Sequence, residues 1–165
     1  MNSAYLLYAW RFLMLGVLQV LVLMNMPFGQ INLYIYPLAI LFLPLEIPVM
    51  VLMLIGFTYG LCIDLFYNSV GLHASALVFL SLIKNWLAIK LSPRADFDFS
   101  KTINKNLYGI GWFLQFALLM LAIHIIWVIT LEEFGFGLLW LLRVLLSFLL
   151  SAILWVIYQF IFNPK

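Results

Sequence analysis

Residues 49–91 read VMVLMLIGFTYGLCIDLFYNSVGLHASALVFLSLIKNWLAIKL, which is two apolar runs joined by a short polar turn at 68–71. Each run is about 20 residues long, the length that an α-helix needs to cross the hydrocarbon core of a bilayer. Transmembrane β-strands are about half as long and alternate strictly between polar and apolar residues, which neither run does. This stretch therefore predicts a hairpin of two membrane-spanning helices.

The composition extends this interpretation to the whole chain. Of its 165 residues, 67% are hydrophobic and 8% are charged, against roughly 25% charged in an ordinary soluble domain. The mean hydropathy is +1.18. Apolar segments cover about 5–24, 31–45, 49–67, 72–91, 107–131 and 137–162, and the one longer polar loop is 92–106. We therefore expect an all-α integral membrane protein with six transmembrane helices in a single domain, 1–165.

Two segments need a separate comment. Residues 1–26 lack a small-x-small cleavage site, so we interpret them as a retained first helix rather than a signal peptide. The second segment is short for a full span and contains Pro37 and Pro44, which predicts a broken or a shallow helix. Cys62 is the only cysteine, which excludes an intrachain disulfide and a cysteine metal cluster.

The basic residues predict the orientation. Five of them cluster around the junction of the fourth and fifth segments: Lys84, Lys90, Arg94, Lys101 and Lys105. By the positive-inside rule this junction is cytoplasmic, and six spans then place both termini in the cytoplasm. The turns at 25–30, 68–71 and 130–137 contain no Lys or Arg, as expected on the outer side. Lys84 lies within the fourth segment, and we expect its side chain to snorkel to the cytoplasmic surface.

The third segment has a polar end and a face of small residues. Asp64 lies about one helical turn inside the outer end of this segment. Gly56 and Gly60 precede it at four-residue spacing, so all three share one face, and this spacing lets helix backbones approach closely. We expect the glycines to receive another helix, either the sixth segment or a transmembrane helix of a partner.

The sixth segment carries a complementary pattern. Ser147 and Ser151 follow Arg143 at the same four-residue spacing. Antiparallel packing on the third segment would bring Arg143 and Asp64 to similar depth, either as a direct pair or within a shared polar pocket. The alternative is that Arg143 snorkels outward while Asp64 reaches headgroup water.

The histidines indicate structure rather than catalysis. His73 follows Gly71 at the start of the fourth segment, where it fits a cap or a pocket lining, and His124 fits a hydrogen bond between helices. No local spacing supports a metal site made from these histidines and Asp64. The chain has no nucleophile elbow, Walker loop or His-Glu-x-x-His motif, so we expect no cofactor and no enzyme, but a binding or scaffolding component.

The hairpin also carries a resemblance. Residues 60–74 follow the pattern GL-x-x-D-x-F-x-x-x-x-GLHA, and residues 44–48 follow PL-x-IP. The chain thereby resembles the MreD family of rod shape-determining proteins, although members often carry a proline where this chain has Val70. The length, the short loops and the basic loop after the fourth segment are similar as well.

The resemblance implies a function and a set of partners. It implies a scaffold of the cell-wall elongation machinery in the bacterial cytoplasmic membrane, bound to an MreC-like single-span protein. The indirect partners would be MreB-like filaments, a RodA-like glycosyltransferase and a transpeptidase; no nucleic acid is implied. The family fold is similar to the substrate-binding components of energy-coupling-factor transporters. This similarity makes a small-molecule-binding component of a vitamin transporter the alternative, and a lipid-processing enzyme the third hypothesis.

Overall fold

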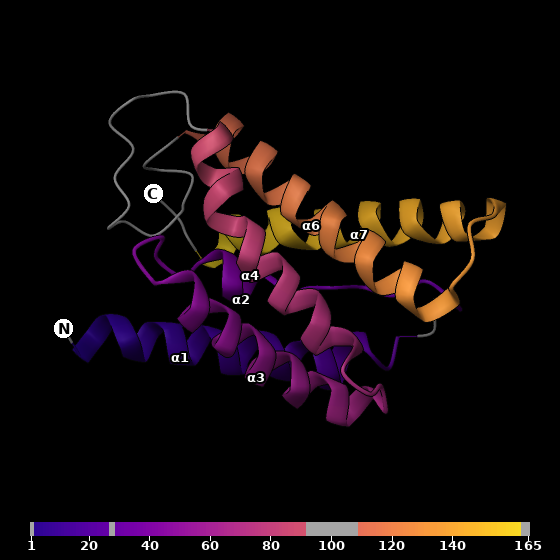
Figure 1. Cartoon of the computed structure of the whole chain (residues 1–165), viewed down its shortest axis with the longest axis horizontal. Helices are drawn as coiled ribbons and strands as arrows, with labels where there is room; N and C mark the ends of the chain where they lie inside the picture. Colours follow the sequence, from indigo (N-terminus) through magenta and orange to yellow (C-terminus); the bar gives the residue numbers. More distant parts are fainter. Residues whose placement is uncertain (1, 27–28, 92–108, 163–165) are drawn as a thin grey trace.

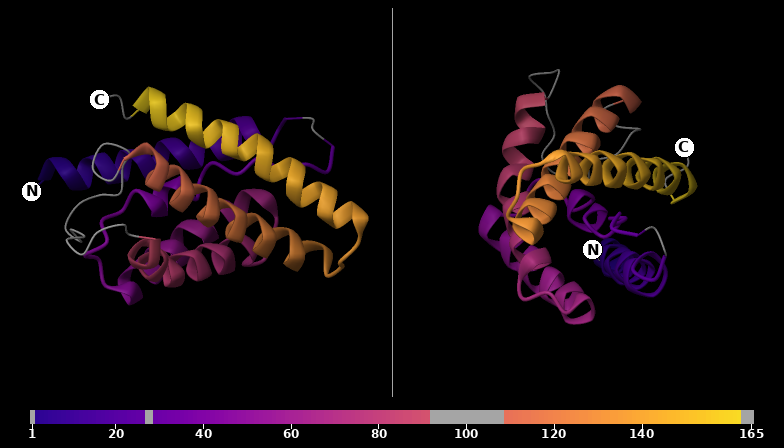
Figure 2. Two further views of the ribbon diagram at one scale, coloured as in Figure 1. Left: turned by 90° about the horizontal axis from the view of Figure 1, so that it is seen from above. Right: turned by 90° about the vertical axis from the view of Figure 1, so that its right-hand side faces the viewer.

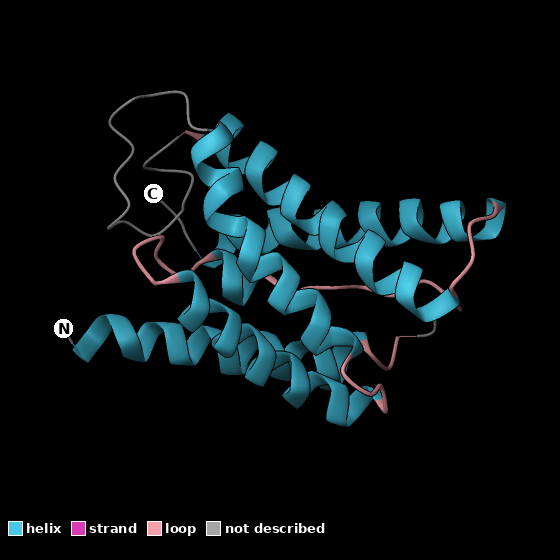
Figure 3. Cartoon of the chain, viewed as in Figure 1, coloured by secondary structure: helices cyan, strands magenta, loops and turns pink. Residues whose placement is uncertain are grey.

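The computed structural model describes residues 2–26, 29–91 and 109–162, and these residues form helices and loops without a β-strand (Figures 1 and 3). The helices in chain order are α1 (Asn2–Val17), the π-helix η1 (Leu18–Leu23), α2 (Leu38–Leu41), α3 (Val49–Tyr67), α4 (Leu72–Leu91), α6 (Ile110–Glu133) and α7 (Leu138–Phe162). The predicted all-helical architecture is confirmed for this part of the chain.

Among the described residues, five helices are long and apolar enough to cross a membrane: the continuous helix Tyr5–Leu23, formed by α1 and η1, and then α3, α4, α6 and α7. Several helices of this length and composition indicate a multi-pass membrane protein. In Figure 1, the start of α1 and the end of α7 lie at the same end of the molecule, and the α3–α4 hairpin and the α6–α7 connection lie at the other end.

The second apolar segment does not form a membrane-length helix, so a count of six such helices is not found among the described residues. Residues 31–35 are extended, and only the four residues of α2 are helical. Pro37 occupies the N-cap of α2, where its missing N–H costs no hydrogen bond, and Pro44 lacks the N–H that a longer helix would require. Because α1 and α3 start at the same end of the molecule, residues 31–45 run back towards that end, and we call them the returning segment (Figure 1).

This returning segment is the centre of the core. Tyr34, Tyr36, Ile40 and Leu41 are completely buried. The α3–α4 hairpin makes the most extensive contact between helices, α6 packs on α4, and α7 packs on α6. The end-on view of Figure 2 shows these helices arranged around the segment. Non-helical backbone at membrane depth is tolerated where protein surrounds it, and that condition is met here.

Candidate functional site

The carboxylate of Asp64 caps the start of α4. Its Oδ1 accepts hydrogen bonds from Ser69 Oγ (2.6 Å) and from the backbone N–H of His73 (2.9 Å), and its Oδ2 accepts one from the N–H of Ala74 (2.9 Å). The first N–H groups of a helix have no partner within the helix, and a negative charge there is favoured by the helix dipole. Asp64, at 4% exposure, therefore holds the two helices of the hairpin together.

The glycine face of α3 is covered by α4. A Cβ atom added to Gly60 would lie 2.3 Å from Ala74 Cα and 2.6 Å from Ala74 N. One added to Gly56 would lie 2.7 Å from Ser81 Oγ. We expected these glycines to receive the sixth segment or a partner, but the close approach that they permit is already used within the hairpin.

The turn between the helices depends on two left-handed residues. Asn68 ends α3 with φ of 53°, and its N–H bonds to the carbonyl of Asp64. Gly71 follows with φ of 76°, a conformation that residues with a side chain rarely adopt. Nothing lies within 4 Å of a Cβ added at Gly71, so the backbone conformation rather than space calls for glycine there.

His73 belongs to a buried cluster on three segments. Tyr36 Oη lies 2.8 Å from His73 Nδ1 and 2.8 Å from His124 Nε2. The tyrosine has a single hydroxyl proton, so it donates to one histidine and accepts from the other. The cluster joins the returning segment to α4 and α6, so His124 bonds to Tyr36 of that segment rather than to a neighbouring helix as expected.

Arg143 is not paired with Asp64. Its guanidinium bonds to Glu132 and to Glu133, each at 2.7 Å, across the short connection from α6 to α7. The three groups that donate to the Asp64 carboxylate meanwhile all belong to the hairpin. Arg143 and Asp64 lie in separate networks, so the direct pair, one of the two arrangements considered from the sequence, is absent. Arg143 bonds instead to the end of α6, the helix that precedes its own.

Ser147 and Ser151 bond to the returning segment and not to Asp64. The Oγ atoms of these serines accept hydrogen bonds from the backbone N–H of Asn32 (3.3 Å) and of Tyr34 (2.9 Å), respectively. The indole N–H of Trp155, one turn further along α7, donates to the carbonyl of Tyr34 at 2.7 Å. One face of α7 thus replaces the hydrogen bonds that the extended backbone cannot make within itself.

Gln19 of the first helix also bonds to the backbone of the returning segment, a role that was not predicted from the sequence. Its amide donates to the carbonyl of Leu33 (2.7 Å) and accepts from the N–H of Ile35 (2.9 Å), so both of its polar atoms bind the extended backbone. Gln19 is completely buried in the π-helical part of the first helix. An amide within an otherwise apolar run was the signal that could have indicated this role.

Lys84 also differs from its prediction. The side chain is completely buried rather than snorkelling, and its Nζ donates to the carbonyl of Leu43. Its neighbour Asn85 donates to the carbonyl of Leu45 at 3.1 Å. These two residues satisfy carbonyls just beyond the end of α2, where the chain turns towards α3.

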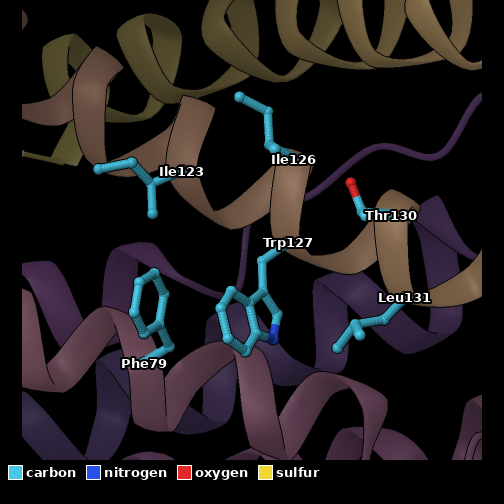
Figure 4. Close-up of a pocket in the computed structure, with 6 residues that line it drawn as sticks. All are labelled: Phe79, Ile123, Ile126, Trp127, Thr130 and Leu131. Atoms are coloured by element: carbon cyan, nitrogen blue, oxygen red, sulfur yellow. The ribbon is translucent and has the colours of Figure 1, made fainter. Parts of the chain in front are cut away.

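A separate hollow of about 290 Å³ lies between α4 and α6 (Figure 4). The side chains around it are almost entirely apolar; Trp127 stacks on Phe79 with ring centroids 4.2 Å apart. None of the candidate residues from the sequence lines this hollow. Within the residues that the structure describes, no group of three or more His, Cys, Asp or Glu side chains is placed to hold a metal ion.

The candidate residues thus form three structural units: the hairpin with Gly56, Gly60, Asp64, Gly71 and His73, the serine face of α7, and the ion pairs of Arg143. Each unit can fix the position of a helix or of the returning segment. No family model, curated protein or solved structure matches this chain.

Proposed function

We propose that this protein is a non-enzymatic scaffold of the machinery that elongates the bacterial cell wall, where it binds an MreC-like single-span partner. The proposal rests on the resemblance of residues 44–48 and 60–74 to the MreD family. The observation that supports it best is that the residues of this motif lie together and form a single structural unit. Gly60, Asp64, Gly71 and His73 all build one connection between α3 and α4, and the side chains of Asp64 and His73 are buried there.

The remaining polar side chains favour a scaffold over a lipid-processing enzyme. Gln19, Ser147 and Ser151 bond to backbone groups of the returning segment. Acid–base chemistry requires a side chain within hydrogen-bond reach of a substrate proton. Side chains that are buried and occupied by the protein's own backbone are suited to hold a rigid surface.

The partner helix requires a face that the protein leaves uncovered. Because α4 covers Gly56 and Gly60, we place the partner against the first helix, of which 17% is buried, against 28–50% for the other membrane-length helices. Leu13, at 59% exposure, lies in the middle of that helix. Leu13→Trp should reduce copurification of the single-span partner, whereas the control Leu149→Trp, at a similarly exposed site on α7, should not.

We propose that the protein lies in the bacterial cytoplasmic membrane with both termini in the cytoplasm, and that residues 31–45 count as its second crossing. The basic residues near 84–105 support this orientation. Single cysteines in a background without Cys62 test it with a thiol reagent that does not cross membranes. Cysteine at Ser69 or Gly135 should be labelled in intact cells and cysteine at Ser100 should not; external labelling at Ser100 would reverse the orientation.

Depletion in a rod-shaped host tests the function itself. Cells should round up, and wall synthesis along their length should lose its organisation. The partner should copurify with the tagged protein in mild detergent. If shape and wall growth stay unchanged while uptake of a vitamin falls and an ATPase module copurifies, the transporter alternative replaces the scaffold.

A further inference from the structure

A second hollow lies beside the α3–α4 hairpin and has a carboxylate in its lining. Its volume is about 440 Å³, within the range of roughly 300–1,000 Å³ found for small-molecule sites. Asp64, Asn68 and Ser69 supply its polar side, and Leu61 and Leu65 supply apolar walls. None of the interactions described so far fills this space.

The hollow presents a negative charge without a cation to balance it. The three donors on the Asp64 carboxylate are a hydroxyl and two backbone N–H groups, all of them neutral. No Lys or Arg of the described residues forms an ion pair with Asp64, and Arg143 is held by Glu132 and Glu133. The start of α4 offsets about half a charge, so the hollow still favours a cationic group.

The walls of the hollow indicate where such a cation comes from. Leu61 is 38% exposed and Leu65 is 79% exposed, on the face of α3 that α4 does not cover. Asp64 lies three residues before the last residue of α3, about 4.5 Å along the helix at 1.5 Å per residue. The hollow therefore opens at headgroup depth and continues into a surface that faces hydrocarbon.

We propose that this hollow binds the primary ammonium headgroup of a phospholipid. The ammonium donates to the Asp64 carboxylate, and the acyl chains lie along Leu61 and Leu65. A primary ammonium has three N–H donors, whereas the quaternary ammonium of choline has none, so the site should distinguish the two. The lysine of a partner protein offers the same ammonium, but the apolar walls running towards the hydrocarbon favour a lipid. This inference is independent of the proposed scaffold function.

The test uses the purified full chain, stripped of lipid and exposed to equal amounts of three probes with identical acyl chains. The probes are phosphatidylethanolamine, phosphatidylcholine and phosphatidylglycerol, and native mass spectrometry counts the lipids that remain bound. We expect the wild type to retain about tenfold more phosphatidylethanolamine than either other lipid, equivalent to about 1.4 kcal/mol.

Three variants locate the site. Leu65→Trp fills the hollow without touching the cap and should abolish the preference, as should Asp64→Asn, which removes the charge. Leu54→Trp is the matched control, because Leu54 is exposed on the same face of α3, eleven residues away, and it should keep the preference. Equal retention of the three lipids by the wild type would overturn the proposal. So would a preference that survives in Leu65→Trp, or binding of a lysine-containing partner segment in the hollow in place of lipid.

Discussion

The backbones of α3 and α4 approach closely at Gly60, and the substitution Gly60→Ala tests this packing. The added methyl carbon would lie 2.3 Å from the Cα atom and 2.6 Å from the backbone nitrogen of Ala74, and 2.8 Å from the carbonyl oxygen of His73. All three are backbone atoms, so no side-chain rotation relieves the overlap, and α3 must move away from α4.

The magnitude follows from two opposing effects. Overpacking costs about 1–3 kcal/mol, occasionally more, and an overlap with backbone atoms belongs at the upper end of that range. Alanine favours a helix over glycine by about 1 kcal/mol, which offsets part of the cost. Separation of the helices also lengthens the bonds from Asp64 to the start of α4. We expect a net loss of about 2–3 kcal/mol, or about 5–10 °C in Tm on the scale of soluble domains.

The assay is thermal unfolding in detergent, followed by tryptophan fluorescence, with a glycine series as its own control. Gly111 lies in α6 with nothing within 4 Å of an added Cβ, so Gly111→Ala should leave Tm unchanged or raise it slightly. Gly56→Ala should be intermediate, because Ser81 Oγ at 2.7 Å belongs to a side chain that can rotate, although the Leu77 carbonyl at 2.9 Å cannot. If Gly60→Ala is as stable as Gly111→Ala, the close packing of the hairpin is wrong.

Three further predictions concern the polar networks. Ser151→Ala leaves a buried backbone N–H without its partner and should lower the free energy of unfolding by about 1–3 kcal/mol. The control is Thr58→Val, which should leave the unfolding temperature nearly unchanged because the exposed Thr58 hydroxyl bonds to carbonyls of its own helix. Asp64→Asn and Arg143→Leu should be additive within about 0.5 kcal/mol in a double-mutant cycle, because the two residues share no partner; a larger coupling energy would restore the shared pocket expected from the sequence. Tyr36→Phe removes the hydroxyl between two buried histidines and should lower stability by about 1–3 kcal/mol, and an unchanged unfolding midpoint would argue against the cluster.

The sequence by itself determined the environment and the helical class of this protein. Apolar runs of this length and a charged fraction of 8% leave helices as the structure that satisfies its own backbone in lipid. The turn at 68–71 and the two prolines of the second segment are also local signals, since they act through the backbone conformation of a few residues. These features need no knowledge of neighbouring segments.

Only the tertiary structure decided which polar groups meet. Four-residue spacing placed Asp64 and Arg143 on suitable helix faces, but it carries no information about which helices are adjacent, and α3 packs on α4. The tertiary structure also explains Gln19, Ser147 and Ser151, because it brings the extended backbone between α1 and α3 within hydrogen-bond distance of their side chains. A buried peptide group must find a hydrogen-bond partner, and when that backbone is not helical, the partner comes from residues up to 121 positions away in the chain.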